Sequence, residues 1–341
     1  MAYTTIDKPT DYFNTKLYTG TGSAQSITGV GFQPDWIWIK QRSGTTHHKT
    51  SDAVRGATKA LKPNNSDEEG TDGQGITSFD SDGFSLGTGG DYNGSSNTQV
   101  AWNWLAGGSS SSNSDGSITS TVSANTTAGF SIVSYTGTGS NATVGHGLGV
   151  APKMIFFKNR SGANNWNTYQ ESLGAGQRMR LNTTGASESS TGFMNNTSPT
   201  SSVFTVGTSS DTNISTNNYI AYCFAEKKGY SKFGKYTGNE STDGTFVYTG
   251  FKPAFVMAKP SSQTGSWSIT DNKRLGYNGD NKRLYPNLTL AEESQAYDLF
   301  SNGFKATTTS GNNNASGQTY IYMAFAENPF VTSTGIPTTA R

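Results

Sequence analysis

The sequence predicts an all-β fold built from three tandem antiparallel β-sandwiches of a jelly-roll, lectin-like kind. Of the 341 residues only 32% are hydrophobic and 14% charged, and Gly (41 residues), Ser, Thr and Asn are abundant. Such a composition favours short strands joined by tight turns, because Thr suits strands while Gly and Asn tolerate positive φ. Runs with the 3.6-residue spacing of long helices are nearly absent.

The second observation is an internal repeat. One stretch recurs in three forms: GFQPDWIWIK (31–40), GLGVAPKMIFFK (147–158) and GFKPAFVMAK (250–259). In each form a lysine follows the proline by six residues, and a YTG tripeptide stands 16 or 17 residues before the proline. Each copy closes on an aromatic run: VAWNWLA (100–106), IAYCFAE (220–226) and IYMAFAE (321–327). Landmarks that keep their spacing in this way predict a triplicated unit.

The landmarks divide the chain into six parts. They are an N-terminal arm (1–12), repeat 1 (13–107), a Ser/Gly-rich linker (108–128), repeat 2 (129–229), repeat 3 (230–328) and a C-terminal tail (329–341). The first half of the linker is flexible by composition, while GSITSTVSA within it could form a short strand. The arm and the tail are candidates for attachment or for contact with a neighbouring subunit.

Each repeat is expected to contain six to eight short strands. In repeat 1 we place them at 14–19, 25–29, 35–41, 46–52, 59–62, 76–79, 83–87 and 98–106. The Asp-Gly in FDSDGF (79–84) and the Asn-Gly in LFSNGF (299–304) mark hairpin turns. Short strands separated by turn signals are typical of a sandwich, in which the last strand can return beside the early ones.

Trp36 and Trp38 could be either an exposed platform for stacking on sugars or part of a core strand. Repeat 2 has Met154 and Phe156 at these positions, and repeat 3 has Phe255 and Met257. Methionine offers no flat stacking face, whereas a core position requires only volume and apolarity. The exchange therefore favours the core. Alternation places Ile37 and Ile39 on the opposite face, so the strand is expected to be covered on both sides.

The candidate ligand-binding residues are polar or aromatic groups that recur downstream of that strand. They are Lys40, His48, Asp52, Arg55, Lys158, Trp166, Lys259, Trp267, Asp271 and Arg274. On consecutive strands these groups could share a groove, in which the rings could stack on a ligand. Two other interpretations stay open: surface ion pairs that tie neighbouring strands together, and partial burial of the rings at a sandwich edge.

Enzyme chemistry finds little support in the sequence, and we expect no catalytic residue, cofactor or metal. No acidic pair recurs in all three repeats, as a glycoside hydrolase would need, and the three histidines lack a triad pattern. DSDG (80–83) resembles the start of a calcium loop, but the rest of such a loop is missing. The single cysteine, Cys223, lies in an aromatic strand and is expected to be a buried structural thiol.

Charge and hydropathy exclude two classes of partner. The net charge is +1 without a basic block, so no nucleic-acid partner is expected. No apolar stretch approaches the roughly 20 residues of a membrane span. The N-terminal sequence MAYTTIDKPTDYF lacks a signal-peptide profile, which favours synthesis in a cytoplasm.

The opening MAYTTIDKPTDYFNTKLYTGTG, together with GFQPDWIWIK, GLGVAPKMIFFKNRS and NYIAYCFAE, resembles a family of proteins encoded by marine bacteriophages and cyanophages. That family carries tandem copies of a domain of unknown function and is labelled as tail-fibre or virion structural protein. The resemblance spans nearly the whole chain and implies a non-enzymatic virion protein, made in the host cytoplasm. It also implies other virion proteins as partners and a homo-oligomer, with a trimer as one candidate.

Three functions are therefore weighed. The first is a tail fibre or appendage that contacts host-surface polysaccharide, which a surface rich in hydroxyl and amide groups would suit. The second is a capsid decoration protein that cements the shell. The third is a glycan-degrading enzyme on a lectin-like sandwich.

Overall fold

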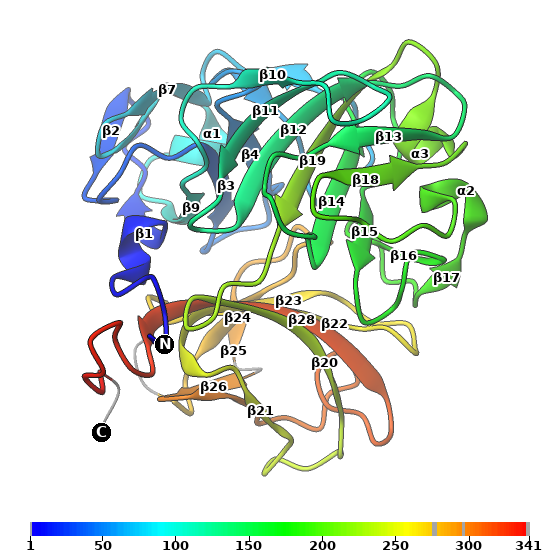
Figure 1. Cartoon of the computed structure of the whole chain (residues 1–341). Coiled ribbons are helices and arrows are strands. Elements are labelled where there is room, and N and C mark those ends of the chain that lie inside the picture. The colour runs from blue at the N-terminus through cyan, green and yellow to red at the C-terminus, as the bar shows by residue number, and fades with distance from the viewer. Residues whose placement is uncertain (1, 275–277, 295–296, 339–341) are drawn as a thin grey trace.

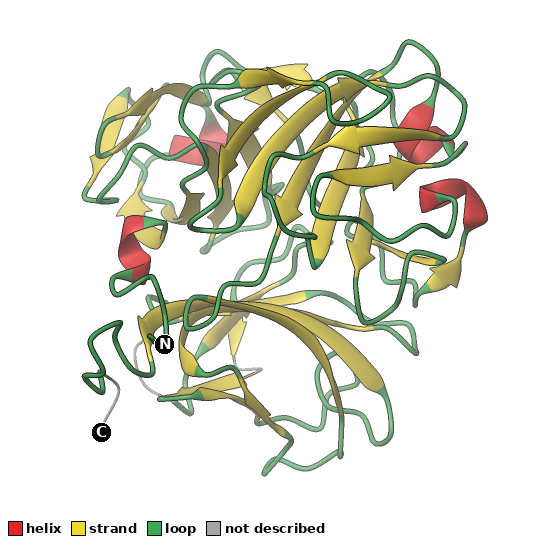
Figure 2. Cartoon of the chain, viewed as in Figure 1, coloured by secondary structure: helices red, strands yellow, loops and turns green. Residues whose placement is uncertain are grey.

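A computed structural model of the chain describes residues 2–274, 278–294 and 297–338 (Figure 1). Strands and turns form almost all of the molecule, and its helices are single short turns (Figure 2). The all-β prediction is confirmed. Within the described residues no helix has the length and apolarity to cross a membrane.

Repeat 1 contains a large and a small sheet, ordered β1-β9-β3-β4 and β2-β8-β7, and the short pair β5-β6. Its strands are β1 (Phe13–Thr19), β2 (Gln25–Thr28), β3 (Trp36–Gln41), β4 (Lys49–Asp52), β5 (Lys59–Ala60), β6 (Gly70–Thr71), β7 (Ile76–Asp80), β8 (Gly83–Leu86) and β9 (Thr98–Trp104). All eight predicted strands are present, and β6 is one that the sequence did not reveal.

Repeats 2 and 3 follow the same plan. The strands of repeat 2 are β12 (Phe130–Thr136), β13 (Ala142–Gly145), β14 (Met154–Asn159), β15 (Asn167–Gln170), β16 (Gln177–Arg180), β17 (Glu188–Ser189), β18 (Val203–Val206) and β19 (Asn218–Phe224). Those of repeat 3 are β20 (Ser231–Thr237), β21 (Phe246–Tyr248), β22 (Phe251–Pro260), β23 (Ser268–Asp271), β24 (Lys282–Leu284), β25 (Glu293–Ser294), β26 (Tyr297–Phe300), β27 (Gly303–Ala306) and β28 (Thr319–Pro329). In every repeat the last strand returns between the first and the third, as β1-β9-β3, β12-β19-β14 and β20-β28-β22.

The strand WIWIK is covered on both faces, as predicted. Ile37 and Ile39 pack into an apolar cluster of repeat 1 with residues of its small sheet, such as Phe84. Trp36 and Trp38, each 1% exposed, point the other way. The core prediction for these tryptophans is therefore confirmed, and repeats 2 and 3 contain equivalent clusters of their own.

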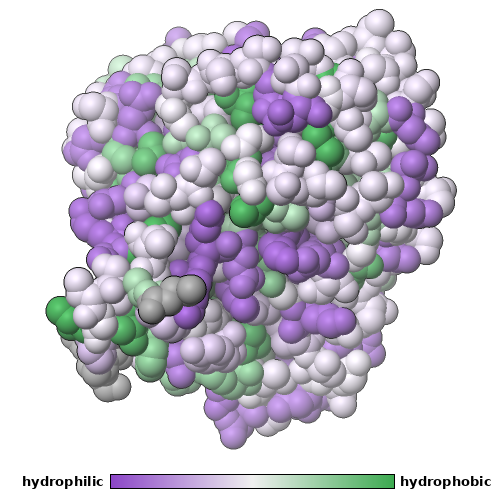
Figure 3. Space-filling view, viewed as in Figure 1, coloured by the Kyte–Doolittle hydropathy of each residue, from purple (hydrophilic) through white to green (hydrophobic). Residues whose placement is uncertain are grey.

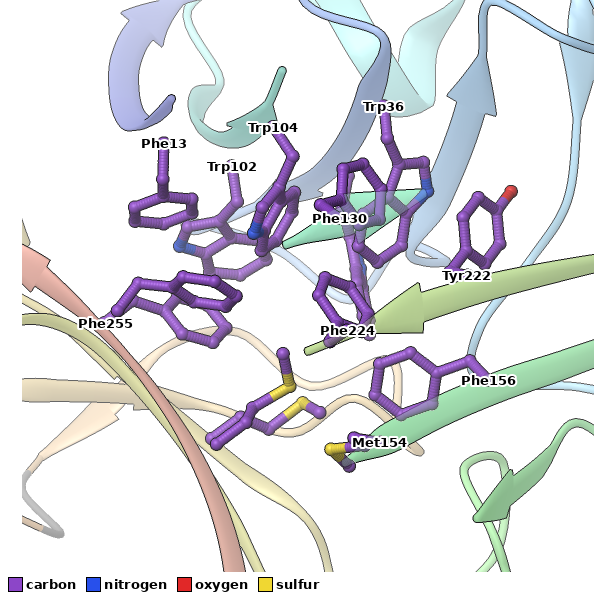
Figure 4. Packing of buried hydrophobic residues seen from close by; sticks show 14 of the residues in the cluster. Phe13, Trp36, Trp102, Trp104, Phe130, Met154, Phe156, Tyr222, Phe224 and Phe255 are labelled. Carbon is purple, nitrogen blue, oxygen red and sulfur yellow. The ribbon is translucent and has the colours of Figure 1, made fainter. Parts of the chain in front are cut away.

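The face that carries Trp36 and Trp38 packs against the other two repeats. The largest apolar cluster draws on all three large sheets, including Trp104, Phe224 and Phe325 from the three closing strands. Figure 4 shows aromatic side chains of this cluster, among them Trp104, Phe224 and Phe255, converging from separate ribbons. The ring centroid of Trp36 lies 4.4 Å from that of Tyr222 in repeat 2, and the Trp104 and Phe255 centroids are 5.8 Å apart. The three repeats are thus lobes of one body around a common core.

The YTG motif pins a turn in each repeat. Its tyrosine hydroxyl donates to the carbonyl that precedes a buried asparagine: Tyr18 to Tyr92, Tyr135 to Thr212 and Tyr236 to Asn313, at 2.7–2.8 Å. The asparagines are Asn93, Asn213 and Asn314, and the Oδ1 of each accepts from a backbone N–H just after the motif. Two of them end the short helices α1 (Gly90–Asn93) and α3 (Ser210–Asn213).

The linker is ordered, which corrects the expectation of a flexible first half. Within it β10 (Ser111–Asn113) pairs with β11 (Ser120–Asn125), which in turn pairs with β12. The hairpin therefore extends the large sheet of repeat 2, and the predicted short strand in GSITSTVSA corresponds to β11. Backbone pairing overrides the loop-like composition here, because an edge strand of repeat 2 offers unpaired N–H and C=O groups.

The arm and the tail pack on their own chain. Tyr3 donates to the carbonyl of Gly250, and the short helix η1 (Pro9–Asp11) precedes β1. Ile6 is buried in the common core, and the N–H of Ser333 donates to Asp7 at 2.6 Å. The described parts of the arm and the tail lie beside repeat 3 (Figure 1). Residues 339–341 of the predicted tail lie outside the described residues.

We expect the three repeats to unfold together. Separating one lobe would expose the apolar inner face of its large sheet, at about 25 cal/mol for each Å² of apolar surface. Scanning calorimetry should therefore give one transition whose calorimetric and van't Hoff enthalpies agree. Three resolved transitions would contradict a shared core.

Candidate functional site

All ten predicted site residues lie in the interior of the molecule. Arg55 is 8% exposed and the other nine are at most 1% exposed. Their polar groups contact protein, at the junctions between repeats or, for Lys40 and Lys259, within their own repeat, so the groove that the sequence predicted is absent at these residues. Ligand binding by them stays a prediction, and their burial argues against it.

The rings eight residues after the lysines link the repeats in a cycle. His48 Nε2 lies 2.9 Å from the Tyr285 carbonyl of repeat 3. Trp166 Nε1 donates to the Lys62 carbonyl of repeat 1, and Trp267 Nε1 to the Arg180 carbonyl of repeat 2, both at 3.0 Å. Repeat 1 thus contacts repeat 3, repeat 3 contacts repeat 2 and repeat 2 contacts repeat 1. The pattern of a closed threefold ring is complete within one chain.

An asparagine supports each of these rings from within its own repeat. The Oδ1 atoms of Asn64, Asn182 and Asn287 accept from the backbone N–H of His48, Trp166 and Trp267 at 2.9–3.0 Å. These asparagines follow the contacted carbonyls by two residues, in KPN, RLN and YPN. One short segment therefore holds the ring of its own repeat and accepts the ring of the next. These asparagines were not among the predicted site residues, although each stands at the same place in its repeat.

His48 stands where repeats 2 and 3 have tryptophan, and its neighbour Trp38 also differs from the residues at the same position in those repeats. Trp38 Nε1 donates to His48 Nδ1 at 2.9 Å, so Nδ1 is the acceptor and Nε2 carries the proton given to Tyr285. The residues equivalent to Trp38 are Phe156 and Met257, which have no N–H to donate. Burial and the nearby Lys40 charge hold the pKa of His48 well below its usual range, so the ring stays neutral.

Two junctions contain a buried ion pair that an aromatic residue of the neighbouring repeat completes. Arg55 Nε lies 2.5 Å from Asp52, which also accepts from the Tyr222 hydroxyl at 2.7 Å. Burial opposes the charge of Arg55, but Asp52 and further partners raise its pKa above the ordinary value.

The pair of repeat 3 repeats this geometry. Arg274 Nε lies 2.7 Å from Asp271, and Trp102 Nε1 of repeat 1 donates to the same carboxylate at 3.0 Å. Repeat 2 has Gln170 and Leu173 at the matching positions, and the residue equivalent to Trp102 and Tyr222 in repeat 3 is Met323. The junction between repeats 2 and 3 therefore lacks this pair.

A second set of ion pairs also occurs at the junctions that repeat 1 makes with repeats 2 and 3. Arg160 binds Glu69 through two hydrogen bonds of 2.8 and 3.0 Å, and Arg42 binds Glu292 through two of 2.9 Å. Both glutamates also donate their backbone N–H to the carbonyl of the arginine that binds them. At the third junction the N–H and the hydroxyl of Ser187 donate to the Ser261 carbonyl, and serines replace the glutamate and the arginine.

The three lysines fasten the loops that follow them. Lys40 donates to the carbonyls of Gln41 and Gly44, and Lys259 to that of Gly265. Lys158 donates to three carbonyls, one of which, Ser66, belongs to repeat 1. Burial lowers the pKa of Lys40 and of Lys158 to about 8, and that of Lys259 to about 7. The hydrogen-bond partners of these ammonium groups are backbone carbonyls and not carboxylates. Desolvation of the charged form is therefore not offset by an opposite charge in contact, and the pKa falls.

One open groove lies beside the junction of repeats 1 and 2. Its volume is about 620 Å³, and the lining includes Lys49, Lys62, Asp67, Glu68 and Asp72. It contains much of the acidic loop DEEGTD (67–72). Lys62 pairs with Asp67 at 2.6 Å, and Lys49 with Asp91 at 3.1 Å. In the described parts of the chain no group of three or more His, Cys, Asp or Glu residues is placed to bind a metal, and Cys223 is a buried free thiol, as expected.

Residues 8–329 match the model of a family described as a domain of unknown function, DUF7483, and the chain belongs to that family. The match runs through all three repeats and the segments between them, which agrees with a common core. No curated protein matches the chain, and no solved structure does.

Exchanging the Trp38–His48 pair for its counterpart in repeat 2 tests the ring contact. His48→Trp alone should lower the free energy of unfolding by about 1–3 kcal/mol, because Trp38 loses its acceptor and the site is overpacked. Adding Trp38→Phe should restore most of that loss. Urea unfolding of both variants measures this, and a double variant no better than the single one would contradict the assigned pairing.

The same histidine predicts a pH dependence. Below about pH 6.5 the unfolded chain protonates His48 while the folded chain does not, so the stability present above that pH is lost on acidification. We expect the free energy of unfolding to fall between pH 7 and pH 5, less so in the Trp38→Phe/His48→Trp variant. His146, whose pKa burial also lowers, keeps its own share in both. Equal slopes would contradict a buried neutral His48.

Removing one partner of a buried ion pair should be costly. Asp271→Asn leaves the Arg274 charge buried with a weaker acceptor, and we expect a loss of about 3–5 kcal/mol. The control is Glu171→Gln, which breaks the exposed Lys153–Glu171 pair and should cost at most about 1 kcal/mol. Similar losses in urea unfolding would show that the junction pair does not support the fold.

Proposed function

We propose that this member of the DUF7483 family is a non-enzymatic structural protein of a bacteriophage virion, in a tail fibre or appendage that contacts host-surface glycans. The observation that carries the proposal is the closed ring of junction contacts. The polar residues that recur from repeat to repeat are used to hold the repeats to one another. Recurring residues that fix the repeats to one another make the chain rigid, as a structural component of a particle needs to be.

The buried carboxylates favour a structural role over glycan degradation. A glycoside hydrolase needs two carboxylates that face one sugar. Asp52 and Asp271 are fully buried, each is bound to an arginine, and each belongs to a different repeat. No sugar could reach them while the junctions stay closed.

The surface supports the glycan part of the proposal. On the face in Figure 3 most residues are white or purple, with smaller green patches scattered among them. Hydroxyl and amide groups on such a surface can exchange hydrogen bonds with sugar hydroxyls.

The test is the position of the protein on purified phage particles. Gold-labelled antibodies should mark a tail or appendage in electron micrographs of the phage that encodes the chain. Label over the shell would favour the capsid decoration protein instead. Label away from any particle would overturn the proposal. Separately, purified protein should leave the chain length of host polysaccharide unchanged, and shortening that Asp271→Asn abolishes would favour the enzyme.

A further inference from the structure

The small sheet of repeat 3 has an exposed aromatic face. We define this aromatic face as Phe246 and Tyr248 on β21 and Phe300 on β26, which are 46%, 56% and 37% exposed. In the described residues, repeat 1 has no large hydrophobic side chain as exposed as these, and repeat 2 has Val150 alone. Because the three repeats share one plan, this difference marks a feature specific to repeat 3.

Repeat 1 has polar residues at the same places. Val247 pairs with Phe304 as Ile27 pairs with Phe84, which aligns Phe246 with Ser26 and Tyr248 with Thr28. In the hairpins, Phe300 opposes Gly303 as Asp80 opposes Gly83. The fold therefore does not require aromatic residues on this face.

Repeat 2 covers the same face with its own chain. Thr143 and Gly145 align with Phe246 and Tyr248. The N–H of Ser117 donates to Thr143 Oγ1 at 2.9 Å, and Ile118 forms a bridge to Val144 at the edge of β13. A Cβ on Gly145 would lie 1.6 Å from Oδ1 of Asn113, so that side chain fills the place of a ring. The face is open and aromatic only in repeat 3.

The Phe246 ring packs against the backbone of the sheet and against the ring of Phe300. A Cβ on Gly303 would lie 2.8 Å from Cζ of Phe246, so the Phe246 ring rests on bare backbone. The Phe246 and Phe300 centroids are 6.0 Å apart with the rings at 71°. A fixed ring loses little entropy when a ligand stacks on it.

Each charged group on this face has a partner: an opposite charge for Lys305 and a backbone N–H for Asp298. Lys305 lies between Phe246 and Asp298 in the sheet register, and its ammonium group forms an ion pair with Asp243. Asp298 accepts from the backbone N–H of Gly279 at 2.9 Å. The face therefore favours neither an anionic nor a cationic ligand, but it offers hydrogen-bonding groups beside the rings.

We infer that the aromatic face is a binding site for neutral polysaccharide, with pyranose rings against Phe246 and Tyr248. A sugar presents an apolar C–H face and a rim of hydroxyl groups, which match aromatic rings that lie beside hydrogen-bonding groups. A second copy of the chain fits less well, because the core of a protein interface is depleted of charged residues, whereas Lys305 lies in the middle of this face. The inference rests on the proposed function for its biological role.

The test compares the purified full chain with variants that copy repeat 1. Native gels containing dextran, mannan or agarose as the polymer should retard the wild-type protein in at least one case. Phe246→Ser/Tyr248→Thr should weaken that binding about tenfold or more. The reverse change in repeat 1, Ser26→Phe/Thr28→Tyr, should strengthen it by adding a second site. Far-ultraviolet circular dichroism and urea unfolding confirm that each variant is folded.

Three outcomes would overturn the inference: no retardation of the wild-type protein in any of the gels, equal retardation of the Phe246→Ser/Tyr248→Thr variant, or self-association in analytical ultracentrifugation that this variant abolishes. None of them bears on the position of the protein on a virion, so a failure here is distinct from a failure of the proposed function.

Discussion

The burial of three apolar sheet faces in one common core is the constraint on which the rest of this structure depends. Each large sheet has one face covered by its own small sheet and a second face that is equally apolar. A single lobe would leave the second face in water. Three such sheets can cover one another only by closing a ring, and the polar groups at the junctions must then be paired because they are desolvated.

The three junctions differ in the polar contacts that pair their buried groups. Repeats 1 and 3 are not consecutive in the chain, and their junction has the Asp271–Arg274 and Arg42–Glu292 contacts. Repeats 2 and 3 are joined by the short connection between Phe224 and Ser231, which the Glu226–Lys232 pair spans. At the positions of the other ion pairs they have Gln170, Leu173, Ser187 and Ser261. A short covalent connection raises the effective concentration of the two surfaces. The weaker polar contacts therefore occur where the chain itself holds the repeats together.

The strands and the repeat could be predicted because both are local or periodic signals. The positions of β1, β3 and β9 follow from alternation and turn residues. The repeat follows from the constant spacing of the YTG tripeptide, the proline with its lysine, and the closing aromatic run. The predicted site residues recur in the sequence, but their location in the interior was not predictable. Trp166 looks the same in sequence whether its indole faces solvent or the Lys62 carbonyl, because that carbonyl lies 104 residues earlier in the chain.

By itself the sequence determined the class of fold, the number of repeats and the core character of Trp36 and Trp38, because volume and alternation are properties of each strand alone. Only the tertiary structure decided that the repeats are lobes of one body and that His48, Asp52 and Arg274 lie inside it. The physical reason is that burial and hydrogen-bond partners are supplied by residues of other repeats. Which small sheet stays open, and which is covered by the linker, depends on the same long-range packing.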